Sequence, residues 1–106
     1  MAIEKFEDII AWQKAGEFTL KIYHAFADCR DFYFCDQIKR AVVSIMNNIA
    51  EGFERKTNKE FARFLYIAKG SCGEVRSMYI SLYDYTILLR NNFKNIISIL
   101  RIYLKF

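Results

Sequence analysis

A regular alternation of four- and three-residue spacings between apolar or small side chains dominates the second half of the sequence. It continues without a slip through Phe61, Leu65, Ala68, Cys72, Val75, Tyr79, Leu82, Thr86 and Leu89. Residues at this spacing share one face of an α-helix, and four heptads of it indicate a long straight helix packed along partner helices. Thr57 and Glu60 stand just before the run at the spacing of a capping box, which predicts where this helix starts.

Three other segments show helical periodicity. They extend from about Phe6 to Ala27, from about Phe34 to Phe53, and from about Asn92 to the last residue. Their apolar stripes comprise Trp12, Ala15, Thr19, Ile22 and Phe26; Phe34, Ile38, Ala41, Val42, Ile45, Ile49 and Phe53; and Phe93, Ile96, Ile97, Leu100 and Leu104. Gly52 falls near the end of the second segment, a common place for a helix to stop.

The four helices have short connections, which make sequential neighbours antiparallel. The chain has no proline and four glycines, a composition that suits long uninterrupted helices. The sequence therefore predicts an all-α single domain over residues 1–106: an up-down-up-down four-helix bundle with a long third helix and a short fourth.

Targeting signals and paired cysteines are both missing from the sequence as read. No apolar stretch of about 18 residues suggests a membrane span, and Met1-Ala2-Ile3-Glu4-Lys5 does not resemble the start of a secretion signal. The three cysteines, Cys29, Cys35 and Cys72, are an odd number without paired spacing. These features favour a reduced, cytoplasmic protein.

Candidate catalytic and metal-binding groups are sparse. The single histidine, His24, follows Lys21 by three residues, so the chain lacks the Glu-x-x-His motif of di-iron bundles. Cys29 and Cys35 have no second pair with which to bind zinc. The stretch Gly70-Ser71-Cys72-Gly73 lies in mid-helix, where small residues allow a neighbouring helix to approach closely, and does not form a phosphate-binding loop. We therefore expect neither a cofactor nor an enzymatic activity.

Apolar residues remain after the stripes are assigned. They are Phe64, Met78 and Tyr85 on the third helix and Ile99, Ile102, Tyr103 and Phe106 on the fourth. A monomer rarely exposes a contiguous patch of this size, which predicts self-association through these two helices. The alternative is a scatter of exposed apolar side chains, which is normal on a monomer.

A line of polar residues borders the apolar face of the second helix. It comprises Gln37, Ser44, Asn48, Glu51 and Arg55, with Arg40 beside them and with Ser71 and Glu74 similarly placed on the third helix. One interpretation is a partly buried network of hydrogen bonds and ion pairs that fixes how the two helices register. The other is a site for a ligand or a partner.

Positive charge is concentrated near the end of the chain. Residues 1–84 hold twelve bases and twelve acids, so the net charge of +4 comes from residues 85–106, which contain no acid. The bases there are Arg90, Lys94, Arg101 and Lys105, which share one helix face, and a second group comprises Arg55, Lys56, Lys59 and Arg63. Together they predict contacts with nucleic-acid phosphates, directed by shape and backbone. Alternatively, they are simply the solvated faces of helices.

Several short motifs resemble those of the 23S rRNA intervening-sequence proteins, a bacterial family of four-helix bundles. They are Phe6-Glu7-Asp8 with Trp12-Gln13-Lys14-Ala15; Asp36-Gln37-Ile38-Lys39-Arg40-Ala41; Ser44-Ile45 with Asn48-Ile49-Ala50-Glu51-Gly52; and the run 60–71 with Glu74. The resemblance covers residues 6 to about 75. The chain departs from it at Met46-Asn47, where the family usually has proline, and in a fourth helix that is shorter than usual.

The resemblance implies a bundle that associates into a ring, typically a homopentamer, without enzymatic activity. Two functions are then open. The first is a homo-oligomer that binds RNA or another nucleic acid through its basic surface. The second is an oligomeric scaffold or protein-interaction module with no role in nucleic-acid binding.

Overall fold

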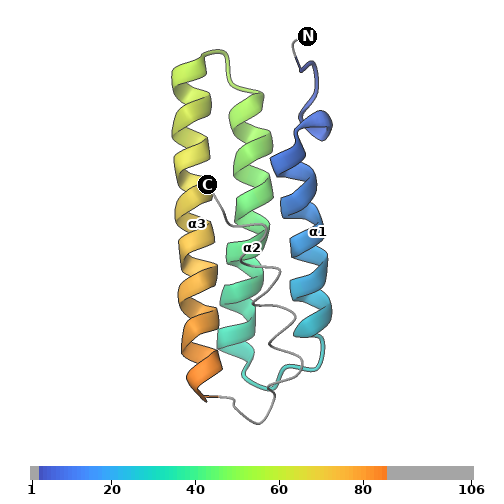
Figure 1. Cartoon of the computed structure of the whole chain (residues 1–106), viewed down its shortest axis with the longest axis vertical. Helices are drawn as coiled ribbons and strands as arrows, with labels where there is room; N and C mark the ends of the chain where they lie inside the picture. Colours follow the sequence, from blue (N-terminus) through green and yellow to red (C-terminus); the bar gives the residue numbers. More distant parts are fainter. Residues whose placement is uncertain (1–2, 86–106) are drawn as a thin grey trace.

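The computed structural model describes residues 3–85 and, within the last turn of that range, the backbone but not the side chains of 82–85 (Figure 1). The described chain is all-helical. A short 3-10 helix, η1 (Phe6–Asp8), precedes α1 (Ile10–Ala25), α2 (Phe32–Phe53) and α3 (Asn58–Tyr85). The predicted fourth helix lies outside the described residues.

In the view of Figure 1, α1 runs down, α2 runs up and α3 runs down, which is the antiparallel order that the short connections predict. In this view α2 lies between its neighbours, and it packs against both α1 and α3. Phe26, the C-cap residue of α1, contacts α3. Its ring packs edge-to-face against the ring of Tyr79, and the two centroids are 6.1 Å apart. The antiparallel order of the first three predicted helices is therefore confirmed.

Local capping explains where α2 and α3 begin. The first helix was expected from Phe6, but residues 6–8 form the 3-10 turn and α1 begins at Ile10. The second begins at Phe32, because the carboxylate of Asp31 accepts a hydrogen bond from the Phe34 N–H at 3.2 Å and caps α2. At the start of α3, the Thr57 hydroxyl accepts a hydrogen bond from the Glu60 N–H at 3.1 Å, as the predicted capping box requires.

The buried core follows the predicted apolar stripes of the three helices. It comprises Ala15, Phe18, Thr19 and Ile22 of α1 with its C-cap residue Phe26; Cys35, Ile38, Ala41, Val42, Ile45 and Ile49 of α2; and Ala68, Cys72, Val75 and Tyr79 of α3. The predicted stripes had not included Phe18 or Cys35, which are 1% and 4% exposed, and among the residues that the stripes did include, Trp12, Phe34 and Phe53 are only half-buried. The buried hydroxyl of Thr19 donates to the carbonyl oxygen of Ala15 at 2.8 Å, which satisfies it within its own helix.

Gly52 has a different role from the one its position suggested. It lies inside α2, is buried, and has no left-handed backbone conformation. A Cβ placed on it would come 2.6 Å from Cβ of Phe64 and 3.0 Å from Cδ1 of Phe61. The glycine therefore allows α2 and α3 to approach closely near their connection, and helix termination does not depend on it.

The small residues of α3 do not all lie against the described helices. Gly70 and Gly73 are exposed, and none of the described residues lies within 4 Å of the position that a Cβ would occupy on either of them. Ser71 and Cys72, between them, are the two that point toward the rest of the bundle, with Cys72 fully buried. The reason is the helix period: neighbouring positions on a helix face different directions.

The surplus apolar surface also differs from the expectation. Phe64 is half-buried beside Gly52, and Met78 is half-buried against the core, so neither is a spare surface residue. Among the side chains of α3 that the structure describes, the large apolar ones that are exposed are Tyr66, Ile67 and Ile80. The side chain of Tyr85 and all of Ile99, Ile102, Tyr103 and Phe106 lie outside the described residues.

Candidate functional site

Three side chains of the predicted polar line meet between α2 and α3. The hydroxyl oxygens of Ser44 on α2 and Ser71 on α3 are 2.9 Å apart and share a hydrogen bond. The amide of Asn48, one turn along α2, donates to the backbone oxygen of Ser44 at 2.7 Å and to its hydroxyl at 2.8 Å. We call Ser44, Asn48 and Ser71 the polar cluster. Its members are half-buried and hydrogen-bonded to one another, which supports the structural interpretation of a helix register.

The other members of the polar line do not join this cluster. Glu51 and Arg55 form an ion pair at 2.9 Å along α2, and Arg40 pairs with Asp36 at 2.8 Å, away from the line. Both pairs are substantially exposed, so each contributes only a few tenths of a kcal/mol. Among the described residues no hydrogen bond or ion pair connects Gln37 or Glu74 to the cluster, and both are exposed.

Removing the cluster's hydroxyls provides a test of this interpretation. We expect Ser44→Ala and Ser71→Ala each to lower the free energy of unfolding by about 1 kcal/mol, because each leaves a half-buried partner without its hydrogen bond. The double variant should cost less than the sum of the two, since the shared bond is lost only once. Urea unfolding of the four proteins measures this coupling.

Ser81→Ala is the matched control, because Ser81 is exposed on the same helix and its hydroxyl donates only to the backbone oxygen of Ser77. Its effect should stay within about 0.5 kcal/mol. Additive effects of Ser44→Ala and Ser71→Ala would contradict a shared bond between the helices.

The basic residues near the α2–α3 connection form a surface group. Arg55, Lys56, Lys59 and Arg63 are all exposed, on the connection and the first turns of α3. Arg55 is held in place, because its guanidinium pairs with Glu51 and lies 4.8 Å from the centre of the Phe64 ring. Residues 51–63 hold these four bases and three acids (Glu51, Glu54 and Glu60), a balance of only one positive charge.

The remaining candidates for phosphate contacts, Arg90, Lys94, Arg101 and Lys105, lie outside the described residues. The structure therefore gathers one of the two predicted basic groups at one end of the molecule. It does not place the second group.

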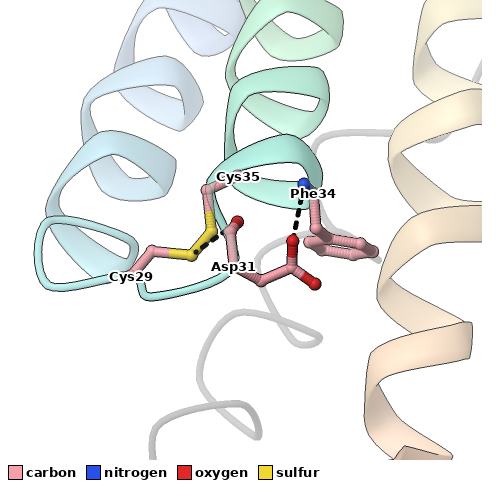
Figure 2. Close-up of a disulfide and its surroundings, with 4 residues drawn as sticks. All are labelled: Cys29, Asp31, Phe34 and Cys35. Carbon is pink, nitrogen blue, oxygen red and sulfur yellow. Dashed lines mark hydrogen bonds between the residues drawn. A yellow bond between two sulfur atoms is a disulfide. The ribbon is translucent and has the colours of Figure 1, made fainter.

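The cysteines contradict the expectation of a fully reduced chain. Cys29, just after α1, and Cys35, in the first turn of α2, form a disulfide (Figure 2). The available signal was that Cys29 lies in the connection between the first two predicted helices and Cys35 at the start of the second, because such a turn brings the two positions close together. Sequence reasoning had instead weighed only their number and spacing.

The third cysteine is in a different environment. Cys72 is 2% exposed within α3, and burial raises the pKa of its thiol to about 12. Burial likewise raises the pKa of the Tyr79 hydroxyl. Both groups therefore stay protonated at neutral pH, and their burial identifies them as core residues.

Metal binding and membrane insertion find no support in the part of the chain that is described. Within residues 3–85, no three His, Cys, Asp or Glu side chains are grouped so that they could hold a metal ion. His24 is exposed on α1. None of the described helices combines the length and the apolar character needed to cross a membrane.

The helical arrangement and the motifs on α1, α2 and α3 agree with a comparison against protein-family models. The model of the 23S rRNA-intervening sequence protein family matches residues 7–105. The chain belongs to this family. The match extends beyond the motifs at residues 6 to about 75 and includes the segment of the predicted fourth helix. A comparison with curated proteins finds no match.

The polar cluster lies within the part of the chain that the family model matches. Ser44, Asn48 and Ser71 all lie in the motifs that carry the resemblance, and the structure shows them in mutual contact between α2 and α3. In this chain, these motif residues therefore form a contact between two helices.

Proposed function

We propose that this protein is a non-enzymatic, cytoplasmic subunit of a homo-oligomer that binds RNA or another nucleic acid through basic surface residues. In this proposal residues 92–106 supply the fourth helix of the bundle, and the family resemblance favours a ring of five copies. The observation that carries the nucleic-acid part is the charge distribution. The whole excess of +4 lies in residues 85–106, and exposed Lys56, Lys59 and Arg63 add bases near the α2–α3 connection.

Exposed apolar side chains support the oligomeric part. Tyr66 and Ile80 on α3 are 73% and 61% exposed, and Leu20 on α1 is 73% exposed. Burial of such side chains against further copies would remove apolar surface from water, which is the main driving force for association. Light scattering should then give a mass well above the 12.6 kDa of one chain, and a monomeric mass at micromolar concentration would refute self-association.

Nucleic-acid binding should depend steeply on salt, because bound phosphates release counterions. We expect the fourfold change of Arg90, Lys94, Arg101 and Lys105 to glutamine to weaken RNA binding by about tenfold or more at low salt. Each lost phosphate contact lowers the slope of log affinity against log salt by about 0.7 for single strands. Fluorescence anisotropy of a labelled RNA across a salt series measures both quantities.

The changes Lys56→Gln, Lys59→Gln and Arg63→Gln together test the second basic group in the same assay. A matched control replaces three exposed bases elsewhere, Lys21 on α1 with Lys69 and Arg76 on α3, by glutamine. An equal loss in the control would show general attraction without a defined surface, and absence of binding at low salt would eliminate the nucleic-acid function.

The alternative is an oligomeric scaffold or protein-interaction module that binds no nucleic acid. It is favoured by the near balance of charge over residues 51–63 and by the engagement of Arg55 with Glu51 and Phe64. It predicts that protein partners co-purify with the chain and remain after nuclease treatment.

A further inference from the structure

The connection between α1 and α2 contains a cysteine pair to which the proposed function assigns no role. The Cα atoms of Cys29 and Cys35 are 6.4 Å apart, within the range that a disulfide spans without movement of the backbone. We propose that this pair is a reversible redox staple, which closes by passing two electrons to a low-molecular-weight disulfide and, when closed, fastens the first turn of α2 to the turn that follows α1.

The two cysteines differ in accessibility, and this difference decides which of them reacts first. Cys29 is half-buried, whereas Cys35 is 4% exposed. The Cys29 thiolate attacks one sulfur of a small disulfide such as oxidised glutathione, and the other half leaves as a thiolate that takes up the proton. Cys35 then attacks the Cys29 sulfur and displaces the second small thiol. The protein loses two thiol protons and two electrons, and two molecules of the small thiol form. A small thiol reverses both steps.

The turn also provides a hydrogen-bond acceptor for one of the two thiols of the open state. Cys29 Sγ lies 3.3 Å from the carbonyl oxygen of Asp31, so the reduced thiol has a hydrogen-bond acceptor already in place (Figure 2). The cap of α2, from the Phe34 N–H to the Asp31 carboxylate, involves neither sulfur. The turn is therefore compatible with both redox states, as a reversible device requires.

The chain offers this pair no competing thiol on the same surface. Cys72 is the remaining cysteine of the sequence, and it is buried in α3 among core residues. Oxidation of a folded chain therefore joins Cys29 to Cys35. A reducing cytoplasm keeps such a pair open and an oxidising challenge closes it, which is how transient cytosolic disulfides act.

The staple encloses the most exposed aromatic side chains of the described helices. Phe32 and Tyr33 lie between the two cysteines and are 75% and 85% exposed, with ring centroids 6.2 Å apart. Closing the staple fixes the turn of helix that carries these rings, and opening it leaves that turn held by the Asp31 cap and by packing alone. The redox state of the two cysteines thus controls how far the helix turn that carries these exposed rings can move.

The test equilibrates the full-length protein in buffers of graded reduced-to-oxidised glutathione ratio, then alkylates the free thiols and counts them by mass spectrometry. We expect a cooperative two-thiol transition at Cys29 and Cys35, reversible from both directions, with Cys72 alkylated only after unfolding. Oxidation should slow hydrogen exchange of the amides at 29–35 by about tenfold and raise the thermal midpoint by roughly 10 °C, as the closure of a short loop predicts.

Two variants control the experiment. Cys72→Ala should keep the full redox response, whereas Cys29→Ser should abolish it and leave the reduced protein folded. A disulfide that persists at every glutathione ratio, chains linked to one another in place of the internal disulfide, or oxidation without slower exchange at 29–35 would each overturn the proposal.

Discussion

Replacing Gly52 by alanine should destabilise the protein by about 2–3 kcal/mol, even though alanine is ordinarily the better helix former by about 1 kcal/mol. The added methyl group would lie 2.6 Å from Cβ of Phe64 and 3.3 Å from the backbone oxygen of Phe61. A Cβ is fixed to its backbone and cannot rotate away, so α3 itself would have to move from α2. Urea unfolding followed by helical circular dichroism measures the loss.

Gly70→Ala and Gly73→Ala are the matched controls, because both glycines lie inside α3 and no residue of the described range 3–85 comes within 4 Å of the added methyl position. Each should leave stability unchanged or raise it by up to about 1 kcal/mol, through the higher helix propensity of alanine. If Gly52→Ala were as stable as these controls, the close approach of α2 and α3 would be contradicted. A loss at Gly70 or Gly73 would instead reveal a contact outside the described part of a single chain.

The helices were predictable because long periodic patterns dominate the chain. The stripe from Phe61 to Tyr79 and the capping pair Thr57–Glu60 give α3 its face and its first turn, and both are confirmed. Periodicity is a strong signal over several heptads, since every residue of the stripe must point the same way. It weakens over single turns, which is why the 3-10 turn before α1 and the start of α2 at Phe32 were missed.

The roles of individual small residues were less predictable. A glycine near the end of a helix has two common explanations, a C-terminal cap or close packing, and only the position of Phe64 shows that Gly52 serves the second. The same limit applies to Gly70 and Gly73, whose neighbours depend on which side of α3 meets another helix. Cys29 and Cys35 likewise required the turn geometry before their pairing was evident.

The candidate site was predicted in part. Periodicity correctly placed Ser44, Asn48 and Ser71 beside the apolar faces that bring α2 and α3 together. It could not separate these from Gln37, Arg40 and Glu74, because a sector of a helix wheel is wider than the contact between two helices. A long side chain such as that of Arg40 can also reach more than one partner, and the Arg40 guanidinium pairs with Asp36 on its own helix.

The second large effect is expected at Phe18, a buried residue of α1 that the predicted apolar stripe did not include. Phe18→Ala should lower the free energy of unfolding by about 3–5 kcal/mol, because a fully buried ring is replaced by a cavity that its neighbours only partly fill. The side chain is 1% exposed and belongs to the core cluster with Ile22 and Val42. Denaturant unfolding measures this loss as a lower midpoint concentration.

Leu20→Ala is the matched control, since Leu20 lies two residues away on the same helix and is 73% exposed. Truncating it should change the stability of the isolated chain by less than about 0.5 kcal/mol. Similar losses at Phe18 and Leu20 would contradict the orientation of α1, because one helix cannot bury two side chains that lie about 200° apart around its axis in the same contact. The two substitutions therefore measure directly which way α1 faces.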